Sequence, residues 1–185
     1  GLPTAILAAL GWGGFIGFIN GWSVSKLKIN SLIVTLATTF IVGGLSLLIS
    51  DRPLHFNNQF LRIFGNEGFL SIPYTVMVFF LLVILFQLLL KKTRFGLKIY
   101  AIGGSQLAAH YAGIDVKRIQ NFVFIISGLL SSLGGIILGS RLLAAGPIYG
   151  QEAAIVAITS VLIGGTVLGG GRGDMVKTFW GVMVL

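Results

Sequence analysis

Long apolar runs separated by short polar segments dominate the chain, and the longest of them carry no charged residue. A helix needs roughly 20 apolar residues to cross the hydrocarbon core of a membrane. The runs lack the strict alternation over about 10 residues that marks the strands of a membrane barrel. The pattern therefore predicts an all-α, polytopic transmembrane helix bundle with spanning helices at 2–25, 31–50, 70–90, 120–140, 153–170 and 175–185.

Composition strengthens this prediction. Of the 185 residues, 55% are hydrophobic and 10% are charged, whereas ordinary soluble domains are about 25% charged. Mean hydropathy is +0.97, so lipid is the expected solvent. The first residue is not Met, and the last apolar run stops unfinished. We therefore expect one transmembrane domain over 1–185 that is incomplete at both ends, an internal piece of a longer membrane protein.

Basic residues orient the spans. The formal net charge is +8, and cytoplasmic loops of membrane proteins carry an excess of Lys and Arg. If the segment 91–118 is cytoplasmic, three basic residues fall outside, namely Arg52, Arg62 and Arg141. The ones that fall inside are Lys26, Lys28, Lys91, Lys92, Arg94, Lys98, Lys117, Arg118, Arg172 and Lys177. The opposite orientation would violate the rule.

The cytoplasmic segment 91–118 contains a short predicted helix. Ser105 is a good N-cap residue, and Gly113 stands where a left-handed C-terminal cap is expected. Gly103 and Gly104 permit a sharp turn into this helix. Leu107 and Tyr111 are spaced i, i+4 and share a face. Such a helix suits docking into a partner's groove, although a loop that only sets topology is an equal alternative.

Polar residues inside the spans are neutral. No Asp, Glu, Lys, Arg or His lies near the centre of a span, which weakens the interpretation as an ion-coupled transporter. Asn20, Thr35, Thr38 and Thr39 are candidates for lining a polar translocation path. The alternative for each Thr is a hydrogen bond back to its own helix.

Glycines recur at four-residue spacing in three places, which places them on one helix face that a neighbouring helix can approach closely. The sets are Gly13, Gly17 and Gly21; Gly135 and Gly139; and Gly165, Gly169 and Gly173. Generic helix packing explains such faces. The region 153–173 is so rich in glycine that two alternatives are kept for it: a full span, or a broken or re-entrant helix.

Enzymatic chemistry has no support in the sequence. There is no Walker A loop, no HExxH motif and no nucleophile–His–acid set. The chain lacks cysteine, and His110 has no neighbours that would complete a metal site. We expect no catalytic residue, no metal and no cofactor of its own.

Four ordered stretches resemble the membrane permeases of ribose/xylose/arabinose-type ABC importers. They read "GFINGWSVSKLKINSLIVTLATT", "TRFGLKIYAIGGSQLAAHYAGIDV", "SGLLSSLGGIILGSRLLAAGP" and "VLIGGTVLGGGRGD". The resemblance covers nearly the whole chain. The chain departs from the family pattern at Asn30, where the family has Pro, and at Ser105, where it has Asn. These departures concern the identity of the sugar rather than the architecture.

The resemblance implies, by analogy of fold, a permease of about ten helices in the bacterial plasma membrane. It implies that this chain begins at the fourth helix and breaks off in the ninth. It also implies three kinds of partner: a second permease copy or sister permease, ATP-binding subunits that hydrolyse the ATP, and an extracytoplasmic sugar-binding protein.

Carried over by position, the resemblance makes 91–118 the loop that couples the permease to the ATPase. Its main elements would be Gly103, Gly104, Ala108, Ala109, Gly113 and Ile114. Arg52, Arg62 and Arg141 are candidates for docking the binding protein. The predicted function is ATP-driven import of a pentose or other monosaccharide. Three alternatives stay open: a permease for branched-chain amino acids, a facilitator or channel that needs no ATP, and a membrane scaffold.

Overall fold

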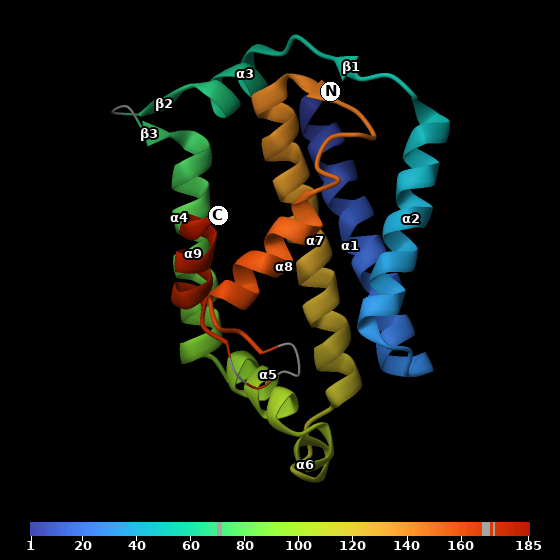
Figure 1. Ribbon diagram of the computed structural model, residues 1–185, viewed down its shortest axis with the longest axis vertical. Coiled ribbons are helices and arrows are strands. Elements are labelled where there is room, and N and C mark those ends of the chain that lie inside the picture. Colours follow the sequence, from blue (N-terminus) through green and yellow to red (C-terminus); the bar gives the residue numbers. More distant parts are fainter. Residues whose placement is uncertain (70–71, 168–170, 172) are drawn as a thin grey trace. The chain divides into compact units, whose positions relative to one another are not determined.

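The chain is mostly helical, which confirms the predicted all-α, polytopic fold (Figure 1). The computed structural model describes residues 1–69, 72–167, 171 and 173–185. The helices are α1 Leu2–Leu27, α2 Ser31–Ile49, α3 Gln59–Asn66, α4 Tyr74–Lys92, α5 Arg94–Gly104, α6 Gln106–Tyr111, α7 Val116–Leu142, α8 Ala153–Ile163 and α9 Met175–Val184. Four two-residue strands join them, namely β1 Leu54–His55, β2 Gly68–Phe69, β3 Ile72–Pro73 and β4 Ala144–Ala145.

Within the described residues, four helices are long and apolar enough to cross a membrane, namely α1, α2, α4 and α7. Side-chain caps fix where several helices begin, because the first N–H groups of a helix have no partner within it. Asn30 caps α2 by accepting a hydrogen bond from the N–H of Leu32 at 2.9 Å. Asn58 caps α3 in the same way through the N–H of Phe60. Asn30 therefore starts its helix by a different device from the family's Pro.

The chain divides into two compact units, and the first comprises residues 1–75 and 120–149. Within it, the glycine face of α1 meets α7 directly. A Cβ on Gly13 would collide with Ser132, one on Gly17 with the carbonyl of Phe124, and one on Gly21 with Asn121. Only hydrogen fits at these positions, so the two backbones touch. This confirms the close-packing face predicted from the four-residue spacing on the first helix.

The loop end of this unit is packed by backbone contacts as well. Gly65 of α3 presses on the carbonyl of Ser140 near the end of α7, and Ser140 is 1% exposed. Strands β1 and β4 pair antiparallel, with Leu54 opposite Ala145. Strands β2 and β3 form a second small antiparallel pair, with Gly68 opposite Pro73.

The other two predicted glycine faces make no close helix contact among the described residues. A Cβ on Gly135 would meet nothing within 4 Å, and one on Gly139 would make only ordinary contacts. Gly128, which the spacing did not single out, is the α7 glycine that touches Gly13. Gly165 has φ +75° and lies in a turn rather than on a helix face; Gly169 lies outside the described residues.

The second unit comprises residues 76–119 and 150–185. Helices α8 and α9 lie against each other in it (Figure 1). A Cβ on Gly181 of α9 would collide with the carbonyl of Ser160 of α8, and Gly164 faces the backbone of Lys177. Helix α8 has 11 residues, about 16 Å at 1.5 Å per residue. The helix predicted over 153–170 thus ends at Ile163, and 168–170 lie outside the described residues.

Candidate functional site

The segment 91–118 is more helical than the sequence indicated. Helix α4 ends at Lys92, and α5 begins two residues later under a cap from Thr93, whose hydroxyl accepts from the N–H of Gly96 at 3.2 Å. A Cβ on Gly96 would collide with the carbonyl of Leu90. Glycine is therefore needed where the two helices turn sharply into each other. Helix α5 was missed because its Lys and Arg residues were interpreted as a loop.

Helix α6 follows α5 and begins at the predicted cap. The Ser105 hydroxyl accepts from the N–H of Ala108 at 3.2 Å, and the backbone of Ser105 is extended, with φ −161°. The sharp turn is therefore at Ser105. Gly103 and Gly104, which were expected to supply it, are the last helical residues of α5.

The C-terminal end of α6 is also closed as predicted. Gly113 has φ +78°, a conformation that glycine adopts at little cost. Its N–H donates to the carbonyl of His110, and the N–H of Ile114 donates to that of Ala109, a pattern that satisfies the last carbonyls of a helix. Just beyond, Asp115 accepts from the N–H of Arg118 at 3.1 Å at the start of α7.

Helix α6 presents apolar side chains outward. Leu107 is 66% exposed and Tyr111 82%, whereas Ala109 is 3% exposed and anchors the opposite side. Ala108 is exposed too. The two large side chains lie one turn apart on a helix whose backbone is capped at both ends, so α6 offers a preformed apolar face.

The residues just before α9 are tied to the same region. The Tyr100 hydroxyl of α5 donates to the carbonyl of Gly173 at 2.8 Å. Lys91 Nζ of α4 lies 2.9 Å from Asp174 Oδ2, and Asp174 caps α9 by accepting from the N–H of Val176. These hydrogen bonds, from Lys91 first and then from the backbone of Val176, hold the pKa of Asp174 below its ordinary value of 3.8. Nothing in the amino-acid sequence indicates this link.

The candidate path residues behave in two ways. The hydroxyls of Thr35, Thr38 and Thr39 donate to carbonyls of their own helix at 2.8–2.9 Å, those of Ser31, Val34 and Thr35. Asn20 is 9% exposed, and its Oδ1 has no hydrogen-bond partner among the described residues. Of the four, Asn20 is thus the one whose side chain is not already used by its own helix.

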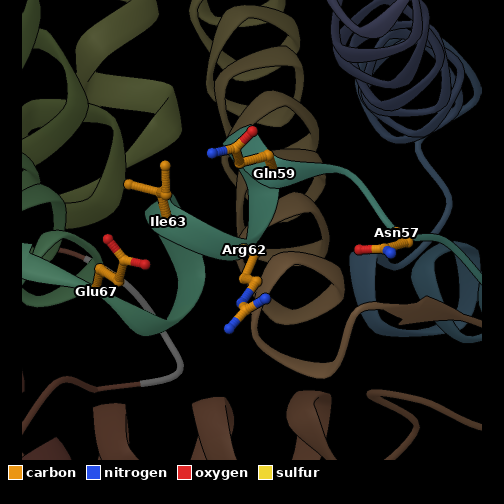
Figure 2. Close-up of a pocket in the computed structure, with 5 residues that line it drawn as sticks. All are labelled: Asn57, Gln59, Arg62, Ile63 and Glu67. Carbon is orange, nitrogen blue, oxygen red and sulfur yellow. The ribbon is translucent and has the colours of Figure 1, made fainter.

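The three candidate docking arginines come from segments that contact one another in the first unit. Arg62 is on α3, Arg141 is at the end of α7 against which α3 packs, and Arg52 precedes β1, which pairs with β4. All three are exposed. Beside Arg62 is a hollow of about 630 Å³, lined by Asn57, Gln59, Arg62, Ile63 and Glu67 (Figure 2).

The described residues contain no group of three His, Cys, Asp or Glu side chains that could hold a metal ion. His110 lies beside the ring of Tyr111, at 6.2 Å between ring centroids.

Comparison with known proteins gives a consistent set of relatives. The model of the family described as branched-chain amino acid transport system / permease component matches residues 1–185. The ribose import permease protein RbsC of Bacillus subtilis is 40% identical over 169 residues, 90% of this chain and 52% of that protein. The L-arabinose transport system permease protein AraH of Escherichia coli is 37% identical over 168 residues, 90% of this chain and 51% of that protein.

A third relative is the D-allose transport system permease protein AlsC of Escherichia coli. It is 35% identical over 184 residues, 98% of this chain and 56% of that protein. The chain thus spans about half the length of the curated relatives it matches. No solved structure matches it.

Proposed function

Since the chain belongs to the family of branched-chain amino acid transport system permease components, we propose that it forms part of the membrane-spanning subunit of an ATP-driven sugar importer. The cargo is a pentose or another monosaccharide, as in the names of the three relatives. The protein is a multi-pass membrane protein, and we place it in the bacterial plasma membrane. A separate ATP-binding subunit hydrolyses the ATP, so the chain itself requires no cofactor.

The observation that carries this proposal is the capped, outward-facing helix α6. An isolated helix of six residues is not stable in water, yet Ser105 and Gly113 fix both of its ends. Its exposed Leu107 and Tyr111 supply apolar anchors of the kind that dock into a groove. The groove is expected to belong to the ATP-binding subunit. The segment 91–118 is then the coupling loop.

The spans suit a neutral cargo. The only charged residues of α1, α2, α4 and α7 lie within a few residues of the helix ends. A sugar carries hydroxyls but no charge, so uncharged amides and hydroxyls are sufficient to line its path. Asn20 is the best-supported lining residue because its buried amide oxygen has no partner among the described residues. A second permease copy or a sister permease would complete the path.

On the opposite side of the membrane, an extracytoplasmic sugar-binding protein would deliver the cargo. Arg52, Arg62 and Arg141 can pair there with acidic residues on its lobes. Reversing the charge of all three should lower uptake at a limiting concentration of the binding protein, because rim charges act mainly on the rate of association. Unchanged uptake by that triple variant would remove the docking role.

A permease for branched-chain amino acids is the second candidate, favoured by the description of the matching family. It predicts that leucine, rather than a sugar, is taken up. An ATP-independent facilitator is the third, and it predicts uptake without any ATPase subunit.

The experiment uses the full-length permease with the ATPase subunit encoded beside it. Leu107→Asp should weaken co-purification of the ATPase about tenfold or more, because burying a Leu side chain is worth about 1.5–3 kcal/mol and 1.4 kcal/mol is tenfold. ATP-dependent sugar uptake in vesicles should fall with it. Gln106→Asp is the matched control, since it adds the same charge at the neighbouring exposed position.

Normal membrane insertion with loss of both association and uptake in Leu107→Asp alone supports the proposal. Uptake that proceeds without ATPase and ignores the substitution would instead favour a facilitator.

A further inference from the structure

The start of α9 receives side chains from two other elements of the second unit. We call Gly173 and Asp174 the α9 junction. Tyr100 of α5, 73 positions earlier in the chain, donates its hydroxyl to the carbonyl of Gly173. Lys91, in the last turn of α4, pairs with the carboxylate of Asp174.

A backbone contact lies beside these two links. A Cβ on Gly171 would come within 2.9 Å of the carbonyl oxygen of Gly103 and 3.0 Å of the backbone nitrogen of Gly104. Gly171 has φ +81°, a conformation that favours glycine. The last turn of α5, which leads directly into Ser105 and α6, therefore touches the chain just before the α9 junction.

The α9 junction is in turn fixed to the two helices beyond it. The side-chain carboxylate of Asp174 accepts a hydrogen bond from the N–H of Val176 at 3.1 Å. The backbone carbonyl of Asp174 accepts one from the Thr178 hydroxyl, also at 3.1 Å. Farther along α9, its backbone touches that of α8 at Gly164 and Gly181. Gly173 and Asp174 thus lead directly into the first turn of α9, and α9 is packed backbone to backbone on α8.

These links contribute little to the stability of the folded protein. Lys91 is 54% exposed and Asp174 24%, and exposed ion pairs contribute little to folding. What the links do provide is geometry. They join the end of α4 and the middle of α5, on one side, to the N-terminus of α9, on the other.

We propose that Tyr100 and the Lys91–Asp174 pair are positioning residues that transmit movement of α5 and α6 to the α8–α9 hairpin. The inference rests on the proposed function, because it assigns a route to the motion that an ATPase would impose on α6. When α5 is displaced, the hydroxyl of Tyr100 carries the carbonyl of Gly173 with it. Lys91 holds Asp174 in register, so α9 follows as a unit with α8. Without these links the ATPase still docks on α6, but its motion is lost before it reaches the hairpin.

The test measures how much ATP is hydrolysed for each sugar molecule taken up. Full-length permease, its ATPase subunit and its binding protein are reconstituted in vesicles with D-ribose, L-arabinose and D-allose in turn. Tyr100→Phe removes one hydroxyl, and Asp174→Asn removes the charge while keeping a good N-cap for α9. Each should raise the ratio of ATP hydrolysed to sugar transported about fivefold, the equivalent of about 1 kcal/mol for one lost hydrogen bond.

Matched controls separate coupling from general damage. Lys91→Arg keeps the positive charge and should restore nearly the wild-type ratio, whereas Lys91→Met should resemble Asp174→Asn. Lys92→Met removes the neighbouring charge, which makes no ion pair within the described chain, and should leave the ratio unchanged. Tyr74→Phe is the control for loss of a hydroxyl. Co-purification of the ATPase should stay at the wild-type level in every variant.

An unchanged ratio in Tyr100→Phe and Asp174→Asn would overturn the inference, and so would an equal fall in hydrolysis and uptake, which marks a merely structural role. A wild-type complex that takes up none of the three sugars with ATP would overturn the proposed function itself. That failure appears in the wild type, so it is distinguishable from failure of the inference alone.

Discussion

The seam between α1 and α7 and the α9 junction join helices by opposite means. In the seam, Gly13, Gly17 and Gly21 of α1 contribute no side chain, and an added Cβ would have no space. At the junction, one hydroxyl and one half-exposed ion pair form the links, beside one close backbone approach at Gly171. The seam gains its stability from many contacts made at once, whereas the junction depends on a few that can be altered singly.

The difference concerns what each region can do. Closely packed interfaces are not continuously deformable, so α1 and α7 are expected to move together. Elements with few buried contacts open at low cost and are the ones that move in conformational switching. The comparison therefore predicts large effects on folding in the seam and effects mainly on coupling at the α9 junction and α6.

The largest effect should come from filling the seam. Gly17→Leu would force the backbones of α1 and α7 apart, because a Cβ at this position already collides with the carbonyl of Phe124. We expect the free energy of unfolding to fall by about 3 kcal/mol or more. The melting temperature in detergent should fall by about 10 °C. Gly11→Leu is the control, since nothing lies within 4 Å of a Cβ there. Equal melting temperatures for the two variants would contradict the claim that α1 and α7 pack closely at Gly17.

A smaller effect should follow from straining the end of α6. Gly113→Val puts a branched side chain on a backbone with φ +78°, and the left-handed conformation costs non-glycine residues roughly 1–2 kcal/mol. Association with the ATPase should weaken about tenfold, while the melting temperature of the spans changes little. Co-purification and thermal unfolding measure the two separately.

Gly104→Ala is the matched control for this variant. The position has space for a Cβ and is not among the glycines with positive φ, so binding should be normal. If Gly104→Ala weakened binding as much as Gly113→Val, the left-handed cap would not be the cause.

The smallest effect concerns the charge of Asp174. Because the hydrogen bond from Lys91 holds the pKa of Asp174 below 3.8, the ion pair stabilises the protein above that pH and is lost as the pH falls through the lowered pKa. At pH 7 the free energy of unfolding of the wild type should exceed that of Asp174→Asn by at most about 1 kcal/mol, since the ion pair is partly exposed. Melting curves between about pH 3 and 7 should converge at the acid end. A difference that grew with acidity would contradict the assignment.

Local features of the site could be predicted because they depend on neighbouring residues. Ser105 and Gly113 mark the ends of α6 through the preferences of single residues for a cap and for positive φ. The spacing of Gly13, Gly17 and Gly21 likewise identifies one face of one helix. In each case the physical cause lies within a few residues of the feature.

Contacts between distant segments could not be predicted in this way. Nothing near Tyr100 indicates that its hydroxyl meets Gly173, and nothing near Gly13 selects Gly128 over Gly135 as its partner. Helix α5 was missed because charged residues favour a loop as readily as the solvated end of a helix. The turn at Gly164 and Gly165 was an open alternative, since glycine both packs within membrane helices and ends them.

The most direct test of the account asks what α6 touches. A photoreactive amino acid is placed at Tyr111, which is 82% exposed on α6. In a second variant it is placed at Tyr149, which is 40% exposed and follows Arg141, one of the residues predicted to lie on the outer side. Both full-length proteins are irradiated in membranes that contain the ATPase subunit, and the adducts are identified by mass. We predict that the probe at Tyr111 captures the ATPase and that the probe at Tyr149 does not. Capture from Tyr149 with none from Tyr111 would contradict the claim that α6 couples this permease to ATP hydrolysis.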